Sequence, residues 1–289
     1  MVERRSLLKL GGVSSLITTT ALWGTSFAFI KLSMGETSPY TYTFVRTMTA
    51  SALLLPLILV KYIKGRLDPL SIKRGFITGL VYSIGLCLQA AGTSYIDPSM
   101  SAFITGLSTI HVHFYVAVVN RKYTILDLVA LTIAIAGLYC LTLPVGGLGI
   151  GELLVFASTF MWALQIILIA RYRRSSILEF LLGTFMAGAI FAPPSLYTGI
   201  TLTREAVIYI VYLALVCSIL ATFFQVLGQR YVSASTAALI FLLEPVFATQ
   251  FSVLMGLETV EPYKMVGGGL ILLSLYIATV SEIRQERGR

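Results

Sequence analysis

Charged residues are scarce in this sequence, because Asp, Glu, Lys and Arg make up only 12% of its 289 residues. Soluble globular domains carry about 25%. Cysteine is also rare, and the three cysteines, Cys87, Cys140 and Cys217, lie far apart within apolar stretches. This spacing matches no metal or redox site. The composition therefore excludes an ordinary soluble domain and a cysteine-based centre.

Nucleotide-binding and catalytic motifs are absent from the sequence as well. There is no Walker phosphate-binding loop and no Gly-x-Ser-x-Gly nucleophile elbow. His111 and His113 are two residues apart, so on a helix they point about 200° from each other and do not bind one metal together. We therefore expect no enzyme, no cofactor, no metal and no ATP-driven pump.

Long uncharged stretches fill most of the chain, and each can form a helix that crosses a bilayer core about 30 Å thick. They lie at 10–30, 75–96, 98–120, 128–151, 153–170, 180–203 and 206–229. Three further candidates are 39–60 and 231–257, which contain Arg46 and Glu244 respectively, and the short stretch 265–281. The sequence thus predicts an all-α membrane protein with ten transmembrane helices.

The first apolar stretch follows Arg4 and Arg5, and this combination resembles a twin-arginine export signal. The stretch is nevertheless long enough to span a bilayer, and no small-x-small cleavage pattern ends it. We expect the first transmembrane helix here rather than a removed leader.

Basic residues are concentrated in alternate connections between the predicted helices. If the N-terminus is inside, the inner segments contain the basic residues at 4–9, 61–74, 121–122, 171–174, 230 and 284–289. The outer segments contain only Lys31, Arg204 and Lys264. The positive-inside rule then predicts a multi-pass plasma-membrane protein with both termini in the cytoplasm. The net charge of +8 follows from this topology and from anionic lipid, so we expect no nucleic-acid partner.

An internal repeat relates the two halves of the chain at a constant offset. QAAGTSYIDPSMSAFITGL at 89–107 aligns with QVLGQRYVSASTAALIFLL at 225–243. The alignment pairs Gln89 with Gln225, Gly92 with Gly228, Tyr95 with Tyr231 and Ser99 with Ser235, and Trp23 and Trp162 form a weaker pair. Because each repeat has five helices, an odd number, the two copies face opposite ways, as in many secondary transporters. The predicted segments are a cytoplasmic tail at 1–13, repeats at 14–143 and 152–281, an outer linker at 144–151 and a tail at 282–289.

Three motifs resemble the EamA family of the drug/metabolite transporter superfamily. They are Ala21-Leu22-Trp23-Gly24-Thr25-Ser26-Phe27 ending at Lys31, Arg46 in the second predicted helix, and Leu243-Glu244-Pro245-Val246-Phe247-Ala248 followed by Gly256-Leu257-Glu258. The resemblance covers 14–281. It implies a ten-helix inverted-repeat carrier whose central cavity lies among the first, third, fourth, sixth, eighth and ninth helices. One departure is Thr109, which stands where the second repeat has Pro245, so a proline break is expected only in the second half.

Polar and aromatic residues at helical spacing are the candidates for the cavity lining. Ser218, Thr222 and Gln225 form one stripe with i, i+4, i+7 spacing, and 158, 162 and 165 form another. The alternative for each is an interhelical hydrogen bond. As a set they favour a cavity for a small organic solute with polar and ring or alkyl parts. The set is Thr20, Trp23, Phe27, Tyr82, Gln89, Thr105, Ser108, His111, Ser158, Trp162, Gln165, Ser218, Thr222 and Gln225.

Arg46, Glu244 and Pro245 are the candidate coupling or gating residues, because charge inside a bilayer is costly and usually faces protein or water. Arg46 either binds an anion or gates, or it forms an outer ion pair or snorkels. Glu244 either carries a proton, binds a cationic group, or stabilises the kink at Pro245. His111 is a further candidate for proton handling.

The sequence therefore predicts a secondary active transporter, an exporter or exchanger of a small, amino-acid-like or amphipathic metabolite. It would work by alternating access through a central cavity. A passive pore is the alternative, and a lipid-linked transferase fits less well because the acidic residues are scattered and the outer loops are short. The expected partners are a small-molecule substrate, the lipid bilayer and a coupling proton, in a monomer or a homodimer.

Overall fold

The computed structural model describes residues 2–120, 124–142, 149–259, 262–263, 265–270, 273–274 and 276–277. All regular elements within these residues are helices. Most of the predicted linker at 144–151 and the whole predicted tail at 282–289 lie outside the described residues. The basic residues Arg121, Lys122 and Lys264 also lie outside them.

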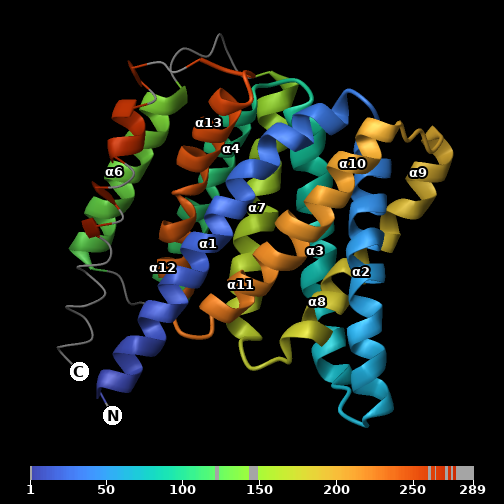
Figure 1. Cartoon of the computed structure of the whole chain (residues 1–289). Coiled ribbons are helices and arrows are strands. Elements are labelled where there is room, and N and C mark those ends of the chain that lie inside the picture. Colours follow the sequence, from blue (N-terminus) through green and yellow to red (C-terminus); the bar gives the residue numbers. More distant parts are fainter. Residues whose placement is uncertain are drawn as a thin grey trace.

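The helices follow one another as long passages that cross the molecule from end to end (Figure 1). Their bounds are α1 (Val2–Met34), α2 (Pro39–Ile63), α3 (Pro69–Thr93), α4 (Pro98–Gly106), α5 (Ser108–Asn120), α6 (Ile125–Thr142), α7 (Ile150–Arg171), α8 (Ile177–Met186), η1 (Ala187–Phe191), α9 (Ala192–Thr198), α10 (Arg204–Tyr212), η2 (Leu213–Leu220), α11 (Ala221–Gly228), α12 (Ala234–Phe241) and α13 (Glu244–Leu254). The element η1 is a 3₁₀ turn and η2 is a π-helix, and each continues the helices on either side.

Within the described residues, seven helical runs are long and apolar enough to cross a membrane. They are Leu7–Met34, Pro39–Ile63, Pro69–Thr93, Ile150–Arg171, Ile177–Thr198, Arg204–Gly228 and Ala234–Leu254. The predicted all-helical, multi-pass membrane protein is thereby confirmed. The helices α4, α5 and α6 are shorter, and the last predicted helix, 265–281, lies partly outside the described residues, so the count of ten stays a prediction. The first helix begins at Val2, inside the segment predicted as a tail.

Local sequence signals explain where several helices begin. Ser38 and Asp68 each precede a proline, and their side chains accept hydrogen bonds from the backbone N–H groups of Thr41 and Ser71. Proline suits the first turn of a helix because its missing N–H has no intrahelical partner there. The polar side chain at the N-cap satisfies one of the remaining free N–H groups.

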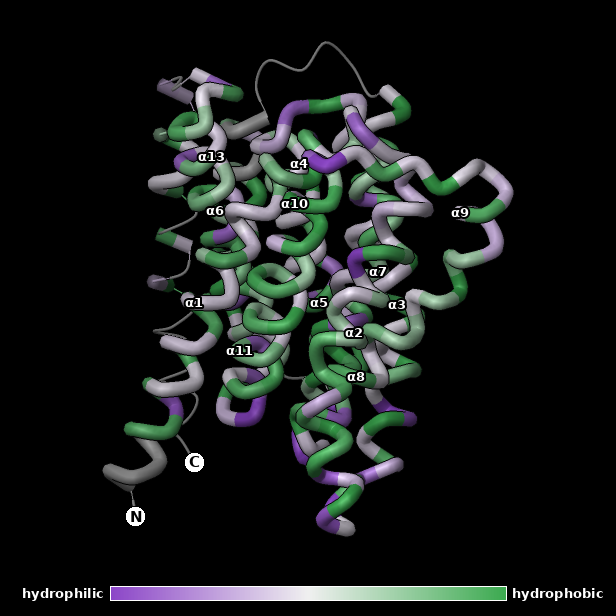
Figure 2. Tube along the Cα trace, turned by 45° about the vertical axis from the view of Figure 1, so that its right-hand side comes forward, coloured by the Kyte–Doolittle hydropathy of each residue, from purple (hydrophilic) through white to green (hydrophobic). Residues whose placement is uncertain are grey.

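The turns lie at two opposite faces of the molecule. At one face, which we call the basic face, Lys61 forms an ion pair with Glu179, and Arg230 Nη2 donates to the Ser175 carbonyl over 2.6 Å. At the opposite face, Lys31 Nζ donates to the Ile96 carbonyl over 3.0 Å. Figure 2 shows hydrophilic residues gathered at turns such as the one below α11, with hydrophobic residues along the helices between them. This distribution suits a protein whose middle section lies in the lipid bilayer.

Glycines bring α3 and α8 into backbone contact near the basic face. A Cβ on Gly75 would lie 2.0 Å from the Phe180 carbonyl oxygen, and one on Gly79 would lie 2.1 Å from that of Thr184. Gly183 meets the Ile72 carbonyl equally closely. Small residues permit such contact where apolar burial gives helices no net attraction in lipid. Gly75, Gly79 and Gly183 therefore permit the close approach of α3 and α8.

Two helical passages are broken near their middle, at equivalent positions of the repeat. The passage of α4 and α5 is interrupted at Leu107, and that of α12 and α13 at Leu242 and Leu243. Only the second-half break lies beside a proline, as the sequence predicts, but the break in the first half is an addition to that prediction. In the first half the break occurs without proline, where Thr109 Oγ1 donates to the Ala238 carbonyl over 2.8 Å.

Candidate functional site

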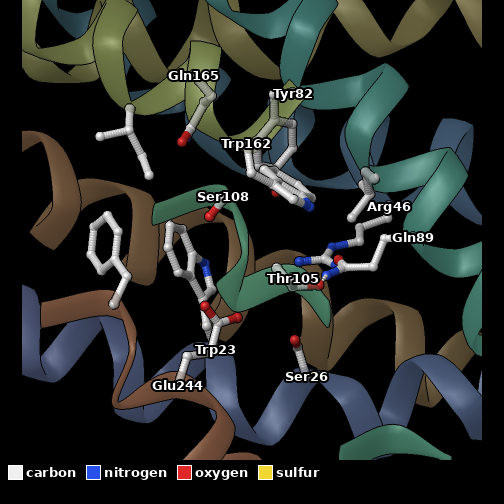
Figure 3. Close-up of a pocket in the computed structure, with 13 residues that line it drawn as sticks. Trp23, Ser26, Arg46, Tyr82, Gln89, Thr105, Ser108, Trp162, Gln165 and Glu244 are labelled. Carbon is white, nitrogen blue, oxygen red and sulfur yellow. Dashed lines mark hydrogen bonds between the residues drawn. The ribbon is translucent and has the colours of Figure 1, made fainter. Parts of the chain in front are cut away.

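A cavity lies among the broken helices and their neighbours. It is shown in Figure 3. Its lining comes from six helical passages: Trp23, Ser26, Arg46, Tyr82, Leu86, Gln89, Thr105, Ser108, Trp162, Gln165, Ile166, Phe241 and Glu244. Both breaks contribute directly, because Thr105 and Ser108 flank Leu107, and Phe241 and Glu244 flank the break in the second half.

Arg46 brings a positive charge from α2 into this lining. Its side chain is only 2% exposed. Nε donates to Ser218 Oγ over 2.9 Å, and Nη1 donates to the Tyr42 hydroxyl. No acidic side chain among the described residues forms an ion pair with it. The alternatives of an outer ion pair or a snorkelling side chain are therefore wrong, and the guanidinium is a buried, oriented cation at the cavity wall.

The π-helix η2 holds the other partners of this region. Ser218 lies in η2 and also hydrogen-bonds to the Tyr82 hydroxyl over 3.1 Å. The Cys217 carbonyl accepts a hydrogen bond of 3.0 Å from Trp23 Nε1 on α1. The wider π turn replaces i→i+4 hydrogen bonding within the segment, and such segments often occur at functional sites. In this protein η2 fixes the positions of Arg46, Tyr82 and Trp23.

Aromatic rings form much of the remaining wall. The Trp162 and Tyr82 rings meet edge to face with centroids 5.6 Å apart, and Trp23 packs against Phe241 at 5.2 Å. The indole nitrogen of Trp162 is buried and has no hydrogen-bond acceptor. A buried N–H without an acceptor costs free energy, so a bound acceptor group in the cavity would be favoured there.

Glu244 is the first residue of α13, and its side chain is 8% exposed. No described residue forms a hydrogen bond or an ion pair with its carboxylate. In Figure 3 the carboxylate lies beside Trp23, whereas the Arg46 guanidinium lies beside Gln89 on another side of the cavity. The cavity thus contains one acid and one base that are not paired with each other.

The two glutamines related by the repeat have different surroundings. Gln89 lines the cavity and donates to Thr105 Oγ1 over 2.9 Å. Gln225 is fully buried and exchanges two amide hydrogen bonds with Gln165, of 2.9 and 3.0 Å. For Gln225 the alternative of an interhelical hydrogen bond is therefore correct.

The structure brings about half of the predicted lining residues together at the cavity, namely Trp23, Tyr82, Gln89, Thr105, Ser108, Trp162 and Gln165, with Arg46 and Glu244 from the coupling or gating set. Those that lie elsewhere are Thr20, Phe27, His111, Ser158, Ser218, Thr222, Gln225 and Pro245. Ser218 stands behind Arg46, and Pro245 is buried next to Glu244 in the first turn of α13.

The predicted lining residues that lie outside the cavity pack against other helices or form hydrogen bonds within their own helices. The Thr20 and Ser158 hydroxyls donate to carbonyls of their own helices, at Ile17 and Val155. Phe27 packs against Ala102 and Ala248, and Thr222 Oγ1 is buried without a hydrogen-bond partner. His111 Nε2 lies 3.0 Å from Thr159 Oγ1, and its ring stacks on Phe160 at 4.1 Å. His111 therefore does not face the cavity.

Sequence reasoning misses four lining residues, Ser26, Leu86, Ile166 and Phe241. Ser26 lies three residues after Trp23, and Leu86 lies between Tyr82 and Gln89, so helical spacing from known candidates would have found both. The set of helices around the cavity also differs from the set that the family resemblance implies. Arg46 on the second passage lines the cavity, and no residue of the eighth passage, 204–228, does so.

The arrangement can bind charge of both signs beside aromatic surface. Arg46 and the Trp162 N–H suit an anionic or carbonyl oxygen, and Glu244 suits a cation or a proton. Among the described residues no group of three His, Cys, Asp or Glu side chains is placed to hold a metal ion.

Comparison with known proteins gives a consistent assignment. The model of the EamA-like transporter family matches two stretches, 10–143 and 149–280. An uncharacterized transporter of Archaeoglobus fulgidus (strain ATCC 49558 / DSM 4304 / JCM 9628 / NBRC 100126 / VC-16) is 27% identical over 271 residues, covering 92% of this chain and 84% of the relative. A second uncharacterized transporter of that strain is 23% identical and covers 92% and 96%.

A solved crystal structure shares the fold with a TM-score of 0.74 and 17% identity, and the match covers 97% of this chain and 99% of the other. The two family matches together span nearly the whole sequence and include every residue that lines the cavity. The chain belongs to the EamA-like transporter family.

Proposed function

We propose that this membrane transporter is a secondary active carrier of a small zwitterionic solute with an apolar or ring-bearing part, such as an amino-acid-like metabolite. The observation that carries the proposal is the presence of two unpaired charges, Arg46 and Glu244, in one aromatic-walled cavity. Burying a charge without a partner is costly, so a solute that brings the complementary charges has a matched site.

The positions of the hydrogen-bond donors and of the carboxylate in the cavity determine the proposed orientation of the solute. Its carboxylate binds the Arg46 guanidinium and the free Trp162 N–H, and its ammonium binds the Glu244 carboxylate. Its apolar part packs against the rings of Trp23, Tyr82 and Phe241. A proton competes with the ammonium for Glu244, and this competition couples solute movement to a proton gradient.

The proposed mechanism is alternating access between two inverted five-helix repeats, with the N-terminus and the basic face in the cytoplasm. The two separate family matches and the equivalent breaks at Leu107 and Leu243 support two repeats. The basic residues of the described turns support the orientation. In transporters of this kind the repeats rock about a site near the middle of the membrane.

A ligand screen on the purified protein tests the solute class. Thermal stabilisation is measured with zwitterionic amino acids, with the matching amines that lack the carboxylate, and with the matching acids that lack the ammonium. We expect the zwitterions to stabilise the protein most. Arg46→Gln should abolish the preference for zwitterion over amine, and Glu244→Gln the preference for zwitterion over acid. Thr20→Ala, outside the cavity, is the control.

Flux measurements in liposomes test the mechanism. We expect uptake that saturates and that rises when unlabelled solute is present on the far side of the membrane. Flux without saturation or countertransport would instead indicate a passive pore. Full pH-gradient-driven uptake by Glu244→Gln would remove the proposed coupling role of Glu244.

A further inference from the structure

A second pocket opens at the basic face, away from the cavity. It is lined by Arg173, Arg174, Arg230 and Tyr231. Arg173 and Arg174 lie in the turn that follows α7, and Arg230 and Tyr231 lie in the turn between α11 and α12. Two turns distant in the sequence thus contribute three guanidinium groups to one opening.

The charges of this pocket are not neutralised within the described part of the chain. No described acidic side chain forms an ion pair with any of the three arginines. Arg230 is held in place because its Nη2 donates to the Ser175 carbonyl, yet its Nε is buried and has no acceptor. Three neighbouring cations repel one another, and a bound anion removes that repulsion. Guanidinium groups match a phosphate in both charge and geometry.

The position of the pocket relative to the membrane indicates where the phosphate comes from. Two candidate spans, Ile150–Arg171 and Arg204–Gly228, end immediately before the lining residues. The pocket therefore lies at the depth of lipid headgroups, where basic clusters attract anionic lipids. Tyr231 is 37% exposed, and tyrosine is enriched at this depth.

We propose that this pocket binds a phosphate group, carried by an anionic phospholipid of the adjoining leaflet. The site is separate from the transport cavity and adds a ligand to the function proposed above. The pocket also lies between the turn after α7 and the turn between α11 and α12, and a series of hydrogen bonds connects these two turns to the cavity.

That series runs along α7 and α11. Next to the pocket, Arg230 binds the Ser175 carbonyl. Gln229, the residue before Arg230, donates from Nε2 to the Ile166 carbonyl over 2.9 Å, and Gln165, the residue before Ile166, pairs with Gln225. Ile166 and Gln165 line the cavity. A phosphate held by both turns would stabilise this seam, so its binding raises the thermal stability of the protein.

Native mass spectrometry of the full chain in neutral detergent tests the proposal. Phosphatidylglycerol is titrated, with phosphatidylcholine, whose choline cancels the headgroup charge, as the comparison lipid. Arg173→Gln/Arg174→Gln is expected to weaken phosphatidylglycerol binding by about 25-fold, or about fivefold for each arginine. Lys64→Gln/Arg66→Gln is the matched control, because it removes two exposed cations from the same face outside the pocket.

A parallel titration with inorganic phosphate separates the two sources of the phosphate group. Tight phosphatidylglycerol binding that millimolar phosphate does not displace supports a lipid site, and equal stabilisation by phosphate alone supports a soluble ligand at the same pocket. Unchanged binding of both probes to the double arginine variant, or an equal loss in the control, would overturn the proposal. If the double variant does not fold, the two single variants replace it, each with its fivefold effect.

Discussion

Gln165 and Gln225 hydrogen-bond to each other in both directions, with N–O distances of 2.9 and 3.0 Å. Both side chains are buried, and only Gln165 lines the cavity. The pair links α7 to α11 at the wall of the proposed binding site. Its two members therefore differ in their position relative to the cavity, although they make the same bonds.

This difference predicts an asymmetry between two variants. Gln165→Leu leaves the Gln225 amide buried without a partner and should cost about 1–3 kcal/mol of unfolding free energy. Gln225→Leu leaves Gln165 facing the cavity, where water can bind, and should cost less. The double variant should cost less than the sum of the two. Reversible unfolding in mixed micelles measures these differences, and equal costs for the two single variants would contradict the prediction.

The glycines between α3 and α8 give a prediction about packing. Gly79→Ala places a methyl group 2.1 Å from the Thr184 carbonyl oxygen, which belongs to backbone and cannot rotate away. We expect a loss of about 3 kcal/mol, since overpacking a close contact displaces the backbone. Gly11→Ala is the matched control, because nothing lies within 4 Å of its Cβ and alanine favours a helix. The thermal midpoint in detergent should fall for the first variant only.

The sequence predicts those features that depend on neighbours along one helix. Apolar length locates the membrane helices. Spacings of i, i+7 and i, i+3 place Tyr82 with Gln89 and Trp162 with Gln165 on shared faces. These inferences need no knowledge of how the helices are arranged.

Features that depend on the arrangement of several helices are not predicted. Arg46 reaches the cavity because Ser218 in η2 and Tyr42 on its own helix orient it, and no pattern within α2 indicates those contacts. The break at Leu107 has no proline to signal it. The repeat predicts equal roles for Gln89 and Gln225, but their neighbours, Thr105 and Gln165, differ.

Asp68, at the start of α3, gives a prediction about pH. Hydrogen bonds from the Ser71 hydroxyl and backbone N–H, of 2.5 and 3.2 Å, lower the pKa of its carboxyl group in the folded state. A lowered pKa stabilises the fold above the unfolded pKa of about 3.9, and this contribution is lost as the pH falls through the lower folded value. The stability of the wild type relative to Asp68→Asn, which keeps the cap but does not titrate, should therefore decline in acid.

Asp97 provides the control for this cap. It also precedes a proline at the start of a helix, but its side chain makes no capping hydrogen bond. Asp68→Ala should cost about 1 kcal/mol near neutral pH, as for other N-cap deletions, and Asp97→Ala clearly less. Equal losses would show that the Ser71 contacts do not stabilise α3.

Pro245 lies in the first turn of α13, directly after the helix break in the second half. The equivalent passage in the first half breaks at Leu107 without a proline, and the Leu107 and Leu243 N–H groups each bond to a carbonyl three residues back, over 3.0 Å. The break in the second half should therefore persist in Pro245→Ala, with Glu244 still in the cavity. We expect this variant to fold and to retain transport. Thr109→Val, which removes the hydroxyl bond to Ala238 at the equivalent position, should cost about 0.6 kcal/mol. A folded Pro245→Ala protein that binds solute but no longer transports it would show instead that the proline itself is needed for gating.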